Sequence, residues 1–286
     1  MFEATRGAAL GWIASAVLLV FVDRALNAWR WIELLAALSP GSRPPFPIVL
    51  RIFFVSTFVG SFLPSVGGDV YRAYSLSRYE VRLAESAASV LMDRVLGVLS
   101  MVLLSAIALA AAPQVPRDSW AGVSLAAAGA GCVIAAAMVF SSRAAAAVHW
   151  AASRLPWPRL HGIALTLTDA VRRYGNHHGE LLRVLGASVM VQALRVLQAF
   201  CLGRAIGIDL PLGTYFVFIP IAVLMMQLPI TVSGLGVAQG AFVWLFGQAG
   251  VAAAQATALS LLFIALGFLG NLPGATLYAL GKRPKR

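Results

Sequence analysis

A few charged residues interrupt an otherwise apolar sequence, and they are the side chains best suited to chemistry. Asp69 and Arg72 are three residues apart, and Asp93 and Arg94 are adjacent near the start of a long apolar run. Arg195 lies near the centre of another such run. An ionisable group in apolar sequence is costly to keep there, so it indicates a binding or transport function.

A proline and two glycines break the apolar run that precedes the first charged pair. Pro64 removes a backbone donor, and Gly67 and Gly68 permit conformations closed to other residues. Asp69 then stands where it can cap a new helix that carries Arg72 one turn later. We therefore predict an apolar helix, a sharp break and a charged helix start.

A second segment repeats this pattern later in the chain. Pro229 follows a leucine, and Ser233, Gly234 and Gly236 come next, ahead of the short apolar helix expected over Val237–Phe246. Broken helices at matching positions of two halves are the best pointer in a sequence to a transporter site. The alternative is that both segments are ordinary surface turns that end helices.

Both predicted breaks have features that favour binding of a phosphate group. Helix N-termini and glycine-rich turns offer backbone N–H donors to an anion, and an arginine such as Arg72 adds bidentate recognition. Asp93 and Arg94 have two interpretations that stay open: they take part in the same site, or their pairing only holds two helices together. The first interpretation predicts a lipid headgroup site built from both segments and these charges.

Arg195 needs a polar environment inside its span. Gln192 and Gln198 lie three residues to either side, so Gln192 and Arg195 share a helix face. A central arginine is expected to face a polar cavity or a carboxylate such as Asp93. We therefore place Arg195 on the substrate path, although a purely structural role is an equal alternative.

Other site chemistries find little support in the sequence. No nucleophile motif, P-loop, paired-carboxylate motif or metal-ligand cluster is recognisable, so neither a cofactor nor a metal is expected. Only Asp93 and Glu85 keep a membrane enzyme acting on a lipid-linked substrate open as a third reading. The four histidines fall in one polar stretch and are interpreted as solvated. Net charge is +11, yet no folded basic domain is present, so nucleic acid is not an expected partner.

The elements that must position these residues are membrane helices. Sixty per cent of residues are hydrophobic, 12% are charged and the mean hydropathy is +0.83, whereas average chains carry about 25% charged residues. We predict one all-α transmembrane domain over residues 1–286, a polytopic bundle of about seven or eight spans with one or two re-entrant or broken segments. A crossing needs ~20 mostly apolar residues. The candidate spans are Ala8–Val22, Phe46–Leu63, Ala87–Ala112, Trp120–Phe140, Leu185–Ile206, Leu212–Leu228 and Val251–Leu280, of which the last is longer than a bilayer requires.

Basic residues predict the orientation. The polar stretch 141–183 carries six arginines against two carboxylates, and the C-terminal tail is equally one-sided. Both are expected on the cytoplasmic side of a bacterial inner membrane, with one or two interfacial helices over residues 143–180. A further set of residues is predicted to anchor the first span at the interface: Arg24, Trp29, Arg30 and Trp31.

The two segments together resemble a known family. The residues that carry the resemblance are Leu63-Pro64-Ser65, Gly67-Gly68-Asp69, Arg72, Ser89-Val90, Asp93-Arg94, Gly97, Leu228-Pro229-Ile230 and Ser233-Gly234-Leu235-Gly236-Val237. This pattern, from about Trp12 to Tyr278, is similar to the lysylphosphatidylglycerol synthase transmembrane (flippase-like) family. The resemblance implies a helical membrane domain with re-entrant segments that handles a lipid.

Two features depart from the family pattern. The family usually places an Arg-Glu pair where this chain has Ala238-Gln239, and the resemblance implies that the chain begins near the family's second helix. No aminoacyl-transferase domain is recognisable. We expect a lipid translocase for a phosphate-bearing, polyprenyl or amino-lipid, with anionic membrane lipids as partners. The alternative is a non-transporting subunit that scaffolds a glycosyltransferase or another lipid-modifying enzyme.

Overall fold

The predicted all-α membrane architecture is confirmed. The structure, a computed structural model, describes residues 2–38, 45–63, 67–79, 81–111, 146, 150, 166, 168–227 and 235–280. Within these ranges the regular structure is helical. Four helices have the length and apolarity to cross a membrane, which makes the chain a multi-pass membrane protein: α1 (Phe2–Leu38), α4 (Leu83–Ala111), α8 (His178–Ala205) and α11 (Ala253–Ala279).

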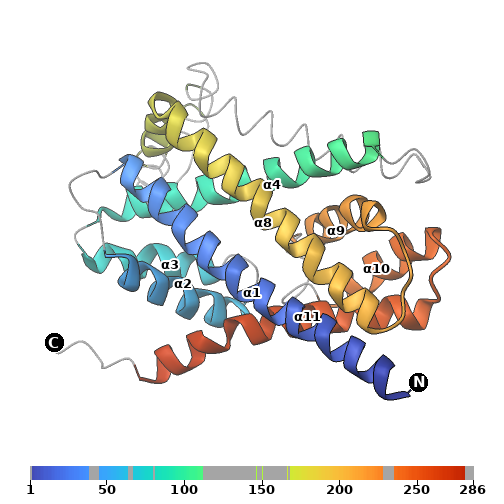
Figure 1. The fold of residues 1–286 in the computed structure, drawn as a ribbon. Helices are drawn as coiled ribbons and strands as arrows, with labels where there is room; N and C mark the ends of the chain where they lie inside the picture. Colours follow the sequence, from blue (N-terminus) through green and yellow to red (C-terminus); the bar gives the residue numbers. More distant parts are fainter. Residues whose placement is uncertain are drawn as a thin grey trace.

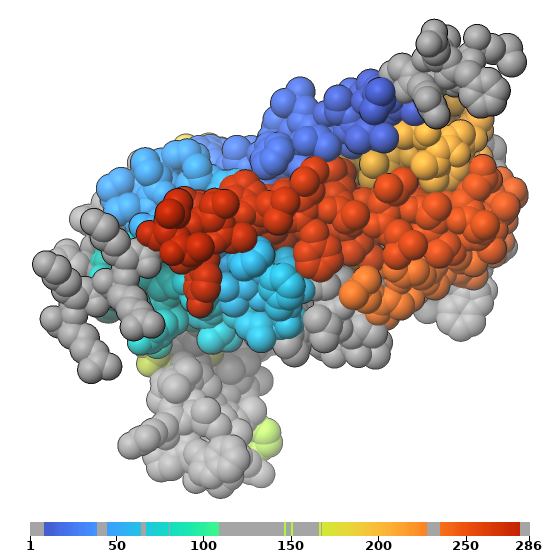
Figure 2. Space-filling model, turned by 90° about the horizontal axis from the view of Figure 1, so that it is seen from below, coloured from blue at the N-terminus to red at the C-terminus, as the bar shows by residue number. Residues whose placement is uncertain are grey.

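The four long helices form two differently tilted sets that cross in the middle of the molecule (Figure 1). In Figure 1, α1 and α8 lie against each other in opposite directions, with α4 on one side and α11 on the other. Figure 2 shows α11 (red) crossing the surface between α1 (dark blue) and α2 (Phe46–Gly60), the helix that follows α1 in the sequence. At about 1.5 Å per residue, each long helix exceeds the ~30 Å of a hydrocarbon core.

The first helix is longer than the sequence analysis predicts. The expected span Ala8–Val22 continues through Asp23 and Arg24 to Leu38. These charges do not end the helix because Asp23 is only 1% exposed and pairs with arginines inside the protein. The first span therefore carries buried polar residues in the region where the other long helices cross it.

Each predicted broken segment is a pair of short helices. One pair is α2 (Phe46–Gly60) with α3 (Gly67–Leu76), and the other is α9 (Leu212–Met226) with α10 (Val237–Gln248). α2 and α9 have 15 residues each, about 22 Å of helix, which is less than a crossing needs. The predicted spans Phe46–Leu63 and Leu212–Leu228 are therefore too long as elements. Residues 64–66 and 228–234, which join the helices of each pair, lie outside the described residues, so the predicted re-entrant character stays a prediction.

The two helix pairs approach the centre from opposite ends of the long helices (Figure 1). α2 packs mainly on α3 and α11, whereas α9 packs mainly on α4 and α10. Close backbone contacts hold the first pair: a Cβ on Gly68 would lie 3.0 Å from the Cα of Gly60 and 2.8 Å from the carbonyl oxygen of Ser56. Glycine is required where two backbones come this near.

Apolar packing surrounds the polar centre. One cluster joins α8, α9, α10 and α11, where Tyr215 and Phe246 meet edge to face with ring centroids 5.2 Å apart. A second joins α1, α4 and the start of α8, where the hydroxyl of Tyr174 donates to the carbonyl oxygen of Leu34 at 2.8 Å. Burial raises the pKa of Tyr174 well above its ordinary value, so this hydroxyl keeps its proton and remains a donor.

One end of the bundle collects basic side chains. Arg82 and Arg173 both bind the buried carboxylate of Glu85, at 2.5 and 2.9 Å. Residues 168–173 are helical, and Ala170, Val171 and Tyr174 are buried as their helical spacing predicts. The expected span Trp120–Phe140 and most of the expected interfacial helices lie outside the described residues.

Candidate functional site

A cavity of about 310 Å³ lies at the centre of the long helices. Five arginines line it, and they come from four helices: Arg24 and Arg30 from α1, Arg72 from α3, Arg94 from α4 and Arg195 from α8. Two lining carboxylates face them. We call this space the arginine cavity. Its volume is at the lower end of the roughly 300–1,000 Å³ typical of small-molecule sites.

Asp93 is the centre of the arginine network. Its carboxylate accepts from Arg30 Nε at 2.7 Å and from Arg72 Nη2 at 3.1 Å. Arg30 also donates to Ser188 Oγ on α8 at 3.0 Å, and the Arg72 guanidinium lies 4.8 Å above the ring of Trp31. All three charged side chains are buried, so this network joins α1, α3, α4 and α8 in the interior.

Asp69 connects the short helix α3 to α4. Its carboxylate accepts from Arg94 Nε and lies 3.9 Å from Arg72 Nη2. Asp69 is the third residue of α3, which begins at Gly67, so it lies inside the helix and is not the cap that the sequence analysis predicts. Its side chain therefore pairs across to α4. Asp69, Arg72, Asp93 and Arg94, which are predicted as site residues, do lie together.

A second carboxylate group lies on α1. Asp23 accepts from Arg24 at 2.8 Å, and Arg195 lies 3.4 Å from the other oxygen of Asp23. The prediction that Arg195 faces a polar cavity is met, but its carboxylate partner is Asp23 rather than Asp93. The reason is that α1 continues through this level and lies against α8. Gln192 shares the face of Arg195, with its amide oxygen 3.5 Å from Arg195 Nη1.

Among the described residues, the charges that line the arginine cavity do not balance. Five arginines face Asp69 and Asp93, and Asp23 adds a third carboxylate behind Arg24 and Arg195. Within the described part of the chain, the buried Nε atoms of Arg24 and Arg72 have no hydrogen-bond partner. An excess of two positive charges around a cavity inside a membrane protein is costly unless an anion compensates it.

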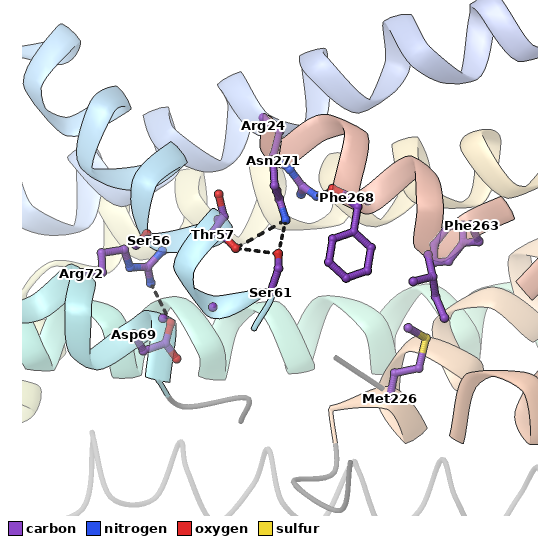
Figure 3. Close-up of a pocket in the computed structure, with 14 residues that line it drawn as sticks. Arg24, Ser56, Thr57, Ser61, Asp69, Arg72, Met226, Phe263, Phe268 and Asn271 are labelled. Atoms are coloured by element: carbon purple, nitrogen blue, oxygen red, sulfur yellow. Dashed lines mark hydrogen bonds and ion pairs between the residues drawn. The ribbon is translucent and has the colours of Figure 1, made fainter. Parts of the chain in front are cut away.

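A second cavity adjoins the first between α2, α3 and α11 (Figure 3). It has a volume of about 360 Å³. Ser56, Thr57 and Ser61 of α2 and Asn271 of α11 form its polar wall, and Phe263, Ile264 and Phe268 are among its apolar lining residues. We call this space the hydroxyl cavity. The two cavities share five lining residues: Arg24, Thr57, Asp69, Arg72 and Met226.

The predicted glycines have different positions. Gly68 lines the hydroxyl cavity, whereas Gly67 and Gly236 line neither cavity. Gly236 has a φ of +87°, and its N–H donates to the side chain of Gln239 at 2.5 Å. In this chain Gln239 therefore satisfies the first backbone donor of α10. Four other predicted site residues, Pro64, Pro229, Ser233 and Gly234, lie outside the described residues.

Sequence reasoning missed the contribution of α1. Arg24, Arg30 and Trp31 were predicted as interfacial anchors, yet Arg30 and Trp31 are 4% and 0% exposed and take part in the network. The prediction is wrong for Arg30 and Trp31, because α1 carries them past the expected end of the span. A signal was present: Asp23, Asn27 and Arg30 recur at helical spacing and so define one polar face.

Comparison with known proteins identifies one family. Residues 1–274 match the family described as the lysylphosphatidylglycerol synthase TM region. Neither the curated proteins nor the solved structures include a significant match to this chain.

Proposed function

The chain belongs to the lysylphosphatidylglycerol synthase TM region family, and from this premise we propose that it is a lipid translocase. Membership of this family connects the protein with lipid handling in a membrane. The proposed cargo is a lipid with a phosphate in its headgroup, and the proposed location is the bacterial inner membrane. The proposal is carried by one observation: five arginines line the arginine cavity, whereas only three carboxylates face them among the described residues.

A phosphate suits this cavity better than a neutral group does. A phosphate oxygen accepts paired N–H donors from a guanidinium, and such charge-assisted bonds are strong in a low-dielectric interior. Arg72 has a buried Nε without a partner and a single close contact to Asp93, at 3.1 Å. In the proposed mechanism a phosphate displaces Asp93 from Arg72, while Arg30 retains Asp93.

The short helix pairs support a path for the lipid. α2 and α9 both end near the level of the cavity, and Thr57, Met226 and Gln227 from their C-terminal turns line it. Broken helices at membrane depth are tolerated where they line a cavity. The proposed path leads along these helix ends, so that the headgroup stays in polar surroundings while the acyl chains remain in the bilayer.

Transbilayer exchange in proteoliposomes tests the proposal. The purified full chain is reconstituted, and outer-leaflet reduction of fluorescent anionic phospholipids and polyprenyl phosphate is measured against empty vesicles. We expect exchange well above the empty-vesicle rate. Exchange at that rate for every lipid contradicts the proposal and leaves the scaffolding alternative.

Two arginine variants localise the activity. Arg72→Lys keeps a positive charge beside Asp93 but loses the planar guanidinium fork, so exchange is expected to fall about tenfold or more, as loss of a charged hydrogen bond implies. Arg204→Gln is the matched control, because Arg204 lies outside both cavities and pairs with the exposed Asp209. Equal exchange by the two variants removes Arg72 from the proposed site.

A further inference from the structure

The polar wall of the hydroxyl cavity consists of side-chain oxygen atoms. The hydroxyl groups among them already donate their protons to backbone carbonyl oxygens. Ser56 Oγ donates to the carbonyl oxygen of Phe53 at 2.8 Å, and Thr57 Oγ1 donates to that of Phe54 at 2.9 Å. A hydroxyl has one proton and two lone pairs. Ser56 and Thr57 therefore present acceptors to a ligand, and a ligand group beside them has to donate.

Asn271 extends this acceptor wall from the opposite side. Its Nδ2 donates to Ser61 Oγ at 2.9 Å, and Ser61 Oγ donates its own proton to the carbonyl oxygen of Thr57 at 2.9 Å. Because that proton is committed, Ser61 can only accept from Asn271, which determines the orientation of the amide. Within the described ranges, the Oδ1 of Asn271 is buried without a hydrogen-bond partner, and Figure 3 shows the amide hydrogen-bonded to Ser61 and Thr57.

The charges beside this wall disfavour a cationic donor. Each carboxylate near the two cavities is shared by two arginines: Asp23 by Arg24 and Arg195, Asp93 by Arg30 and Arg72, and Asp69 by Arg72 and Arg94. An ammonium group in the hydroxyl cavity would lie beside the lining side chains of Arg24 and Arg72. Like charges in a low-dielectric site repel strongly. A neutral O–H group meets no such cost.

We infer that the cargo is a phospholipid whose phosphate bears an uncharged polyol, and that the hydroxyl cavity holds this polyol beside a phosphate in the arginine cavity. This inference rests on the proposed function. Thr57 borders both cavities, so one ligand can contact it with its phosphate on one side and its hydroxyl groups on the other. The apolar lining residues Phe263 and Phe268 suit the first carbons of the acyl chains.

Four probes separate the headgroup chemistries in the same vesicle assay. Phosphatidylglycerol carries a neutral polyol, phosphatidic acid carries none, and phosphatidylethanolamine and lysylated phosphatidylglycerol carry ammonium groups. We expect phosphatidylglycerol to exchange about tenfold faster than phosphatidic acid, as one or two added hydrogen bonds imply, and both ammonium lipids to stay near the empty-vesicle rate. Equal rates for all four lipids, or preference for an ammonium lipid, overturn this inference and leave the proposed function standing. No exchange of any phosphate lipid overturns both.

A matched pair of variants tests the location of the polyol. Thr57→Val removes a cavity hydroxyl with little change of shape, and Thr276→Val makes the same change at an exposed position of α11. Because Thr57 also borders the arginine cavity, we expect Thr57→Val to slow phosphatidylglycerol several-fold more than it slows phosphatidic acid, and Thr276→Val to change neither lipid. Parallel loss of both lipids in Thr57→Val, or no loss, overturns the assignment of the hydroxyl cavity. Unchanged thermal unfolding of both variants shows that the effect is local.

Discussion

Each aspartate of the site is shared between two arginines, and this sharing explains how so many charges remain inside a membrane protein. Asp93 is 8% exposed, and its partners Arg30 and Arg72 are 4% and 5% exposed. A buried charge that loses its partner costs far more than a surface charge does. The same arrangement leaves part of the arginine charge uncompensated, which is the property that the proposed function uses.

Replacing Asp93 tests this network. Asp93→Asn keeps the size of the side chain but leaves two buried arginines without their carboxylate, so the free energy of unfolding is expected to fall by about 3–5 kcal/mol. The measurement is the thermal unfolding midpoint in detergent. Asp209→Asn is the control, because Asp209 is 85% exposed in its pair with Arg204, and surface pairs contribute about 0–1 kcal/mol. Equal midpoints for the two variants would show that the Asp93 network does not hold the fold together.

At the scale of elements, the short helices owe their positions to backbone contact. α2 packs closely on α11, where a Cβ on Gly274 would overlap the carbonyl oxygen of Phe54. Without a hydrophobic driving force between helices in lipid, small residues that permit such close approach stabilise the contact through van der Waals packing. This contact places Thr57 and Ser61 of α2 opposite Asn271 of α11, and so it forms the hydroxyl cavity.

Adding one methyl group at this contact should separate the helices. Gly274→Ala is expected to lower the unfolding midpoint and to weaken lipid exchange, since forced overpacking costs about 1–3 kcal/mol. Gly186→Ala is the matched change in α8, where a new Cβ meets nothing within 4 Å. Because alanine favours a helix over glycine by about 0.5–1 kcal/mol, the control should be neutral or stabilising. A stable, active Gly274→Ala protein would contradict the close α2–α11 contact.

At the scale of the molecule, the two ends of the bundle differ in charge. Arg82 and Arg173 meet at Glu85 beside the start of α8, while Asp209 follows its other end. Arg78, which lies on the 3-10 helix η1 (Ser77–Tyr79), belongs to the first end. Basic residues favour the cytoplasmic side, and this rule supports the proposed orientation, with the C-terminal end of α11 also inside.

Labelling in intact cells tests the orientation. In a background where Cys132 and Cys201 are replaced by serine, a membrane-impermeant maleimide is expected to label Asp209→Cys but not Arg78→Cys. Permeabilised cells should label both variants, which confirms that both sites are reactive. The reverse pattern in intact cells would place the basic end outside and contradict the proposed cytoplasmic orientation.

Much of the site was predictable because its strongest signals are local. Asp69, Arg72, Asp93 and Arg94 were predicted from charge in apolar sequence, and the structure brings them together. The α1 contribution was missed because the predicted first span stops at Val22, just before Asp23 and Arg24. Their partners, Arg195 and the carbonyl oxygen of Gly267, lie far away in the sequence, so spacing within one helix could not reveal that these charges are satisfied.

The sequence alone determined the membrane environment, the all-helical class and the two segments where short helices replace long ones, because composition, hydropathy and proline–glycine chemistry act locally. Only the tertiary structure decided which charges share a cavity. Asp23 pairs with Arg195, and Asp93 with Arg30 and Arg72, because crossing helices place them at one depth. The excess of arginine and the acceptor wall beside it depend on the same long-range packing. The charged residues that first drew attention in the sequence thus form two shared groups around two adjoining cavities.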